Sequence, residues 1–273
     1  MPLNIDGTLV LAGAGNMGGA LLAGWLAQGL DPARVIVQDP GPNPAMAAML
    51  AKAGIASTAR TQLSTPPAVL LMAVKPQLME DVFPALARQA GPETVVLSVA
   101  AGRTIASFEK HLPARAAVVR SIPNTPASVG RGITAAVPNA HVTPKQKALC
   151  DTLLHGVGEV VWVEREDLID AATAVSGSGP AYVFLLAECL AEAGRKAGLP
   201  ADVAAALARW TVAGAGELLH RSELAPDQLR RNVTSPNGTT HAALQVLMAA
   251  NGLQPLLDQA IAAATHRSRE LAS

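Results

Sequence analysis

The chain has 273 residues, of which half are hydrophobic and 3% aromatic, and its formal net charge is zero with a pI near 7. That length accommodates one large domain or two ordinary ones. Balanced charge lacks the basic footprint of nucleic-acid-binding proteins, so a nucleic-acid partner is not expected and a small molecule is favoured.

Cysteine content and the first residues indicate the compartment. Cys150 and Cys189 lie far apart without a CxxC spacing, which predicts neither a disulfide framework nor a zinc site; no metal is expected. The opening MPLNIDGTLVLAGAG has neither the basic region nor the long apolar core of a signal peptide. No run of 18 apolar residues is free of polar interruption, so no membrane span is expected. These features favour a cytoplasmic protein with reduced thiols.

Residues 1–164 alternate short apolar runs with longer amphipathic ones. Short, continuous, β-branched runs are typical of strands buried on both faces. The expected strands are 8–12, 35–37, 69–73, 94–99, 116–121, 132–138 and 159–163, and the expected helices are 16–29, 43–53, 78–90, 104–111 and 144–154. This alternation predicts an α/β fold with a doubly wound parallel sheet.

Residues 165–273 carry helix signals alone, punctuated by glycine and proline. An all-helical second domain is therefore expected to follow the α/β domain. Runs such as FLLAECLAEAG and VLMAANG leave little polar face, and a helix that is apolar nearly all round must be buried. A well-packed monomer core is one way to bury it. We expect instead that this domain packs against another subunit.

The sequence VLAGAGNMGGA places G-x-G-x-x-G at Gly13, Gly15 and Gly18, after an expected strand and at the start of an expected helix. This context predicts a Rossmann-type dinucleotide site, in which the glycines allow a tight turn, close approach of a pyrophosphate and close helix–strand packing. A simple tight turn is the alternative. Asp39 ends the second strand; it fits an acceptor for the adenosine ribose, which would favour NAD, and equally a turn or cap residue before Pro40.

Two further loops follow strands at the edge where open α/β sheets bind ligands. They are Ala73–Pro76, which contains Lys75, and Ser98–Gly102. Lys75 fits a ribose or phosphate contact, or a surface charge.

Three further polar or glycine-rich segments lie later in the chain. RSIPNTPA (120–127) ends the fifth strand, and TSPNGTT (234–240) offers hydroxyls and N–H groups ahead of an apolar helix, where a small carboxylate could bind. SGSGP (176–180) interrupts a long helical run, although glycine costs about 1 and proline about 3 kcal/mol in a helix interior. Ordinary capping would account for the first two, and a packing kink for the third.

In this order, GAGNMG, AVKP, SVAAG, RSIPNTPA, DAATAVSGSGPAYVF and SPNGTT resemble pyrroline-5-carboxylate reductase over essentially the whole chain. SGSGPAY and SPNGTT are the most specific motifs. The resemblance implies an NAD(P)-dependent oxidoreductase acting on a CH–NH group, which reduces 1-pyrroline-5-carboxylate to L-proline in the last step of proline biosynthesis. It also implies a C-terminal dimerisation domain, with homodimers joined into a higher oligomer such as a decamer.

The resemblance also implies roles for individual residues. Catalysis falls to Thr240 and Ser176, with Thr240 as a hydrogen-bonding group rather than a strong acid. The substrate would contact Glu166, Ser176, Gly177, Thr239 and Thr240. The cofactor, NADPH with NADH possible, would contact Gly13, Ala14, Gly15, Asn16, Met17, Gly18, Asp39, Ala73, Val74, Lys75, Pro76, Ala100, Ala101, Gly102 and Asn232. SGSGP would hold the substrate over the nicotinamide together with SPNGTT from a neighbouring subunit.

Two positions depart from the usual pattern. Asn237 replaces the first glycine of SPGGTT, which the loop should tolerate because asparagine accepts positive φ better than other residues. The segment before the third strand lacks the asparagine often found near the adenosine, and Arg60 lies near that place. Arg60 fits a contact to a 2′-phosphate, in opposition to Asp39, so NADPH and NADH both stay open.

Two other functions fit the dinucleotide motif but not the rest of the sequence. A β-hydroxyacid dehydrogenase commonly uses a lysine base on the interdomain helix, whereas PAYVFLLAE has none. A non-catalytic NAD(P) sensor would not need the intact SGSGPAY and SPNGTT loops.

Overall fold

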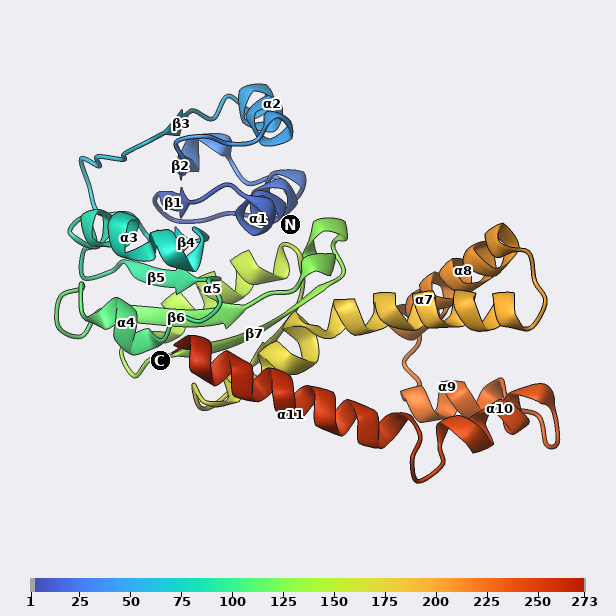
Figure 1. Ribbon diagram of the computed structural model, residues 1–273. Helices are drawn as coiled ribbons and strands as arrows, with labels where there is room; N and C mark the ends of the chain where they lie inside the picture. Colours follow the sequence, from blue (N-terminus) through green and yellow to red (C-terminus); the bar gives the residue numbers. More distant parts are fainter. Residues whose placement is uncertain (1–2, 273) are drawn as a thin grey trace. The chain divides into compact units, whose positions relative to one another are not determined.

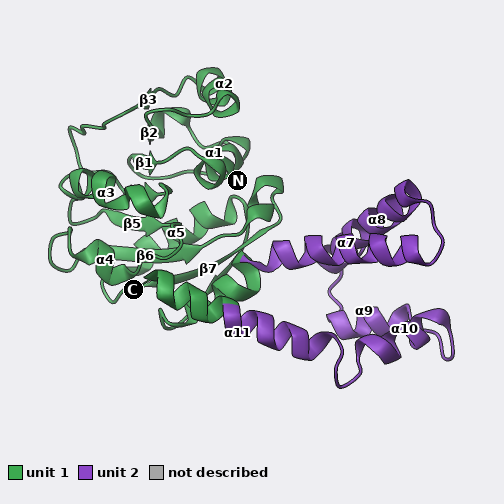
Figure 2. Ribbon diagram, in the orientation of Figure 1, with its two compact units in different colours: residues 1–177, 264–273 green, residues 178–263 purple. Residues whose placement is uncertain are grey.

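The computed structural model describes residues 3–272, so the extreme ends of the two expected domains lie outside it. Contacts divide the chain into two compact units (Figure 2). Unit 1 comprises residues 1–177 and 264–273, and unit 2 comprises residues 178–263. This division is based on contacts. The expected boundary at residue 164 separates a dinucleotide-binding domain from a dimerisation and substrate domain, and it remains a prediction.

Unit 1 is built on one eight-stranded sheet with the order β3-β2-β1-β4-β5-β6-β7-β8 (Figure 1). All neighbours are parallel except β6 and β7, which are antiparallel. The strands are β1 (Leu9–Ala12), β2 (Val35–Gln38), β3 (Ser57–Thr58), β4 (Val69–Met72), β5 (Val95–Ser98), β6 (Ala117–Ile122), β7 (Gly132–Pro138) and β8 (Gly158–Trp162). The predicted α/β fold with a doubly wound sheet is confirmed.

The antiparallel β7 corrects the expectation of a wholly parallel sheet. Parallel neighbours need a crossover of a dozen or more residues. Only nine residues separate Ile122 from Gly132, and they form a short 3₁₀ segment, η3 (Thr125–Val129). The chain therefore turns back beside β6. The two-residue β3 was not expected, because it is too short to leave a periodic pattern.

Helices cover both faces of the sheet. They are α1 (Asn16–Ala27), α2 (Pro44–Ala53), α3 (Met79–Ala87), α4 (Ile105–Glu109), α5 (Pro144–His155) and α6 (Leu168–Ala172), with short 3₁₀ turns η1 (Pro32–Arg34) and η2 (Pro76–Leu78). Side chains alternate along a strand. Accordingly, Leu9 and Leu11 pack into one core with α1, α2 and α5, while Val10 and Ala12 pack into the other with α3, α4 and α6. The strands read as continuous apolar runs because both faces are buried.

One cysteine lies deep in the first of these cores. Cys150 on α5 is fully buried, and burial together with the nearby Asp151 carboxylate raises the pKa of its thiol to about 12. The thiol stays neutral near pH 7 and acts as a small apolar side chain. Cys150 and Cys189 are both free thiols, as the spacing predicted.

Unit 2 consists of helices alone. They are α7 (Gly179–Lys196), α8 (Ala201–Arg221), α9 (Pro226–Asn232), α10 (Thr239–Leu247) and the first part of α11 (Leu253–Ala272), whose last turns belong to unit 1. Within residues 178–263 only Ala204 and Ala208 are buried, whereas Phe184 is 63% and Trp210 74% exposed. Unit 2 therefore lacks an apolar core of its own, and its helices need a partner surface.

Within the described part of the chain, the helical stretch Leu168–Lys196 is long and apolar enough to span a membrane by length and composition alone, with a mean hydropathy of 1.3. Of its apolar window, 6% is buried in the chain. A helix buried between subunits has the same composition, so this single stretch is weak support for a membrane span.

Candidate active site

The glycine motif forms the turn between β1 and α1. Gly13 has φ +90°, and a Cβ there would lie 2.7 Å from the Ala73 carbonyl oxygen. A Cβ on Gly18 would overlap the Gly13 carbonyl oxygen. Around Gly15, in contrast, no atom lies within 4 Å of an added Cβ. Gly13 and Gly18 are thus required by the fold, and Gly15 faces the space that a pyrophosphate would need.

The N-terminus of α1 opens at the same place. Gly15 is its N-cap and supplies no side-chain hydrogen bond to the first-turn N–H groups, which suits an anion. A cavity of about 420 Å³ adjoins the turn. Its lining includes Gly13, Gly15, Asp39, Ala73, Val74 and Lys75 from the predicted cofactor set, together with Ala59 next to Arg60. The residues present therefore fit a dinucleotide.

Asp39 braces this loop. Its Oδ2 accepts the Ala14 N–H at 2.8 Å, and its Oδ1 accepts the Gly41 N–H at 2.9 Å. The second bond is the turn contact considered from the sequence. Each oxygen keeps a further lone pair. The ribose contact of Asp39 therefore remains a prediction beside its observed structural role.

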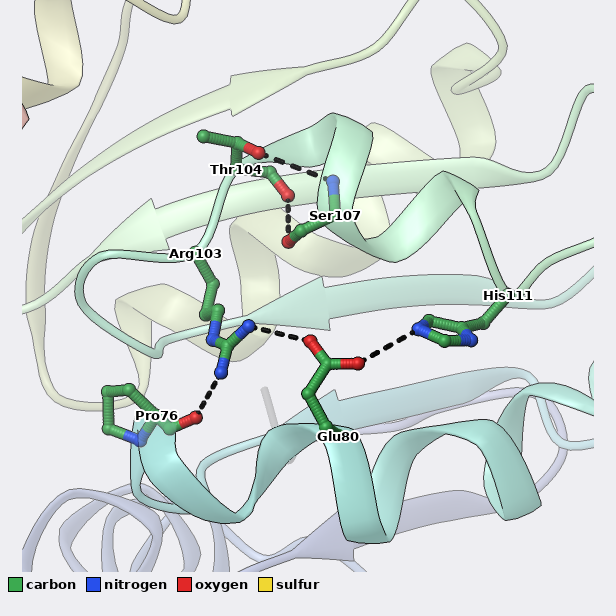
Figure 3. A network of polar contacts seen from close by, with 6 residues as sticks. All are labelled: Pro76, Glu80, Arg103, Thr104, Ser107 and His111. Carbon is green, nitrogen blue, oxygen red and sulfur yellow. Dashed lines mark hydrogen bonds and ion pairs between the residues drawn. The ribbon is translucent and has the colours of Figure 1, made fainter. Parts of the chain in front are cut away.

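The loops after β4 and β5 are linked by an arginine that the sequence did not reveal (Figure 3). Arg103 directly follows Gly102, and its Nη1 lies 2.7 Å from Glu80 Oε1 on α3. Its Nη2 donates to the Pro76 carbonyl, so one guanidinium joins both loops. Glu80 Oε2 also lies 3.3 Å from His111 Nε2. An arginine among surface charges carries no distinctive signal, which is why the pattern did not identify it.

The remaining cofactor predictions fall on these same segments. Asn16, Met17 and Gly18 lie in the first turn of α1, whereas Ala100 is buried, Ala101 is exposed and Gly102 has φ +68° beyond the end of β5. Lys75 is exposed at the start of η2.

The SGSGP sequence lies where the α-helical pattern is interrupted: Ser176 and Gly177 end a π-helical turn, Ser178 is a bend, and α7 begins at Gly179. Thr173–Gly177 form a π-helical turn, η4, between α6 and α7. Two hydroxyls bond back to the helix: Thr173 Oγ1 donates to the Ile169 carbonyl at 2.7 Å, and Ser176 Oγ donates to the Ala172 carbonyl at 2.8 Å. A Cβ on Gly177 would meet nothing closer than 3.5 Å, so the fold of this chain does not itself demand glycine there. Single π turns inside α-helices are frequent at functional sites.

Glu166 makes structural contacts that the sequence did not predict. Its Oε1 accepts both Nη1 of Arg120 at 2.8 Å and the Ile105 N–H at 2.8 Å. The Arg120 side chain is 5% exposed and that of Glu166 is 32% exposed. Glu166 therefore joins β6 to the start of α4. Its assigned substrate contact remains a prediction that would use the other carboxylate oxygen.

The predicted residues of unit 2 lie on α9 and α10. Asn232 ends α9, where its Oδ1 accepts from Gln228 Nε2 at 2.7 Å. Asn237 has φ +59°, so the asparagine does adopt the left-handed conformation that the motif requires. Thr239 and Thr240 are the first residues of α10, and the N-cap Gly238 supplies no side-chain cap. The first N–H groups of a helix have no intrahelical acceptor, so this terminus offers donors to a carboxylate.

Among residues 3–272, no group of three or more His, Cys, Asp or Glu side chains is placed to hold a metal ion. The described residues offer a dinucleotide cradle in unit 1, hydroxyl groups on η4 that can still accept a hydrogen bond, and hydroxyl and N–H donors at the start of α10. An open α/β sheet with such a cradle, followed by a helical domain, defines an NAD(P)-dependent oxidoreductase.

Comparison with known proteins specifies the family. Residues 166–271 match the model for pyrroline-5-carboxylate reductase dimerisation, and residues 8–102 match the model for NADP oxidoreductase, coenzyme F420-dependent. A pyrroline-5-carboxylate reductase from Pseudomonas aeruginosa is 42% identical over 97% of this chain and 96% of its own length. The chain therefore belongs to the pyrroline-5-carboxylate reductase family.

Solved structures agree with this assignment. A pyrroline-5-carboxylate reductase from Coxiella burnetii superposes with a TM-score of 0.91 at 36% identity, covering 98% of this chain and 100% of that one. The Plasmodium falciparum pyrroline carboxylate reductase, solved with NADP bound, gives 0.77 at 26% identity over 98% of this chain and 99% of that one.

Proposed function

We propose that this chain reduces 1-pyrroline-5-carboxylate to L-proline with NADPH, the last step of proline biosynthesis. The observation that carries the proposal is family membership over nearly the full length, which includes both the dinucleotide cradle and the helical domain. A β-hydroxyacid dehydrogenase does not account for that full-length match, and a non-catalytic sensor would not need the intact SGSGPAY and SPNGTT motifs.

The reaction needs positioning more than acid–base power. Bound NADPH would supply the hydride for the imine carbon, and an imine is already electrophilic, more so when its nitrogen is protonated. The protein's contribution is then to orient the two reactants. The turn from Gly13 to Gly18 and the α1 N-terminus would hold the pyrophosphate, while the loops Ala73–Pro76 and Ala100–Gly102 would flank the rest of the cofactor.

Substrate binding would use η4 of one copy and α10 of a neighbouring copy. The N–H groups at the start of α10 and the hydroxyl of Thr239 suit the substrate carboxylate. The Thr240 hydroxyl would hold the proton at the imine nitrogen, either directly or through water. Ser176 Oγ already donates to Ala172, so it would act as an acceptor. Glu166 and Gly177 complete the proposed substrate contacts, and Asn232 is proposed to contact the cofactor.

Assembly of two copies would complete the helical domain. The exposed apolar helices of unit 2 and the match to a dimerisation model support a homodimer. In such a dimer the apolar stretch of α7 would be covered by a second copy rather than by lipid. Assembly into a higher oligomer such as a decamer, and a cytoplasmic location without membrane contact, are further parts of the proposal.

NADPH is proposed as the preferred cofactor. Arg60 is exposed just beyond β3, next to the cavity-lining Ala59, where it can meet a 2′-phosphate. Asp39 accepts two backbone N–H groups, so its position at the end of β2 is accounted for by the fold and is not by itself a sign of NADH.

The test is to mix the purified protein with 1-pyrroline-5-carboxylate and either NADPH or NADH, and to follow cofactor oxidation and proline formation. Proline formation is expected with both, faster with NADPH. Cofactor binding without proline formation would refute the proposed function. Faster turnover with NADH would refute the Arg60 argument alone.

A further inference from the structure

Asn124 lies where the end of β6 meets the π turn. Its side chain is buried, with the residue 8% exposed. Its Nδ2 donates to the carbonyl oxygen of Ser176 at 3.1 Å, and its Oδ1 accepts the Ile133 N–H of β7 at 2.9 Å. One amide thus joins the sheet to η4, using a donor and an acceptor at once.

The two groups it joins have different roles. Ile133 N–H belongs to the strand β7, so that contact fixes the Asn124 side chain to the rigid sheet. The Ser176 carbonyl belongs to the π turn, immediately before Gly177. A π turn departs from the α-helical hydrogen-bond pattern and depends on its surroundings to persist. The Nδ2 contact supplies one such support.

The helix that leads into the turn is anchored separately. Glu166, two residues before α6, is paired with Arg120 on β6. Asp170 on α6 is buried and accepts from Ser268 Oγ of α11 at 2.7 Å. These contacts hold α6 against the sheet and against α11, whereas the Asn124 contact acts on the turn itself. Losing it would leave α6 anchored and release the Ser176–Gly177 backbone.

We propose that Asn124 is a positioning residue for imine reduction: it fixes the backbone of the π turn at Ser176 and Gly177 so that the turn meets the substrate in one geometry. The inference rests on the proposed function, because it assigns the π turn to the substrate. Asn124 acts through the turn and touches neither reactant. A small shift of the Ser176–Gly177 backbone is enough for a large effect, because a displacement of about 1 Å at a catalytic site can lower the rate about a hundredfold.

The decisive variant is Asn124→Asp, which has nearly the same shape. Its carboxylate still accepts the Ile133 N–H but cannot donate to the Ser176 carbonyl. We expect kcat/KM for 1-pyrroline-5-carboxylate to fall about 10- to 100-fold, with the Kd for NADPH unchanged. The loss should shrink as the pH is lowered, because a protonated carboxyl group donates again and a buried aspartate has a raised pKa.

Asn139→Asp is the matched control. Asn139 also joins elements through its amide: Nδ2 donates to Glu109 and to the Ala116 carbonyl, and Oδ1 accepts the Val118 N–H. It lies at the opposite end of β6 and β7, away from η4. This variant should keep its turnover and show no recovery at low pH.

Other ionisable groups lie on the elements that meet at Asn124, namely Arg120, Arg131, Glu166 and Asp170. They are common to the parent and the variants, so the ratio of variant rate to parent rate at each pH removes their titration.

Hydrogen exchange gives a readout independent of turnover. Amides of residues 173–179 should exchange faster in Asn124→Asp than in the parent, and their exchange rates should be unchanged in Asn139→Asp. Parent-like turnover and parent-like exchange in Asn124→Asp would overturn the inference, as would a pH-independent loss accompanied by weaker NADPH binding. An inactive parent would refute the proposed function, and the exchange comparison would then still decide whether Asn124 holds the turn.

Discussion

At the residue scale, substitutions of the glycines in the cofactor turn distinguish a glycine needed for cofactor binding from one needed for folding. Gly15→Ala should fold normally, because an added Cβ meets nothing within 4 Å and φ is −72°. The methyl group would occupy the space proposed for the pyrophosphate, so we expect the Kd for NADPH to rise about tenfold or more, equivalent to ~1.4 kcal/mol. Titration of NADPH fluorescence and thermal unfolding measure the two quantities.

Gly18→Ala is the informative contrast. Its Cβ would overlap the Gly13 carbonyl oxygen, so it should destabilise the protein by about 1–3 kcal/mol as well as weaken binding. If the Gly15→Ala variant binds NADPH as tightly as the parent protein does, the pyrophosphate does not lie at this turn.

The hydroxyl of Thr240 allows a second test. Thr240→Val keeps the side-chain shape and removes one hydrogen bond worth ~1 kcal/mol, so kcat should fall about 5- to 10-fold with NADPH affinity unchanged. Thr152→Val is the control, because Thr152 is exposed on α5 and its hydroxyl bonds only locally to the Ala148 carbonyl. Turnover of Thr240→Val equal to that of the control would remove Thr240 from the mechanism.

At the element scale, the sequence predicted nearly every helix and strand of unit 1 to within a few residues. Continuous apolar runs mark buried parallel strands, and Gly13–Gly18 mark the turn that follows the first of them. The antiparallel direction of β7 could have been deduced from its short connection. The π turn could not, because the side-chain contact that supports it comes from Asn124, 52 positions before Ser176 in the chain.

Some site residues were equally hidden. The family resemblance assigns Glu166 to the substrate but does not reveal its pairing with Arg120, which is a contact across 46 positions of the sequence. Arg103 has no motif and becomes visible only when α3 and the loop after β5 lie together. Motifs show which residue types a site needs, whereas packing shows which of them are already bonded to one another.

The exposed helix α7 gives the prediction at this scale. Phe184→Glu should convert the homodimer to monomers, because burying a phenylalanine contributes ~1.5–3 kcal/mol and a symmetric interface contains two copies. Light scattering coupled to size-exclusion chromatography measures the mass. Lys196→Gln, at an exposed position at the end of the same helix, should leave the dimer intact. A Phe184→Glu protein that stays dimeric would show that α7 lies outside the interface.

At the scale of the whole molecule, the two units differ in how their apolar side chains are buried. Unit 1 has two apolar cores and a cofactor cradle, whereas unit 2 has only Ala204 and Ala208 buried and a helix N-terminus suited to a carboxylate. A second copy would cover the apolar helices of unit 2 and so stabilise the start of α10, which carries Thr239 and Thr240. Dimerisation and substrate binding should therefore be lost together.

The central claim is that hydride passes from the nicotinamide to the imine carbon of 1-pyrroline-5-carboxylate. The direct measurement uses NADPH deuterated at both C4 positions and analyses the product by mass spectrometry. The account predicts proline with one deuterium, at the ring carbon bonded to nitrogen that was the imine carbon. Proline without deuterium, or no proline despite bound cofactor, would contradict it.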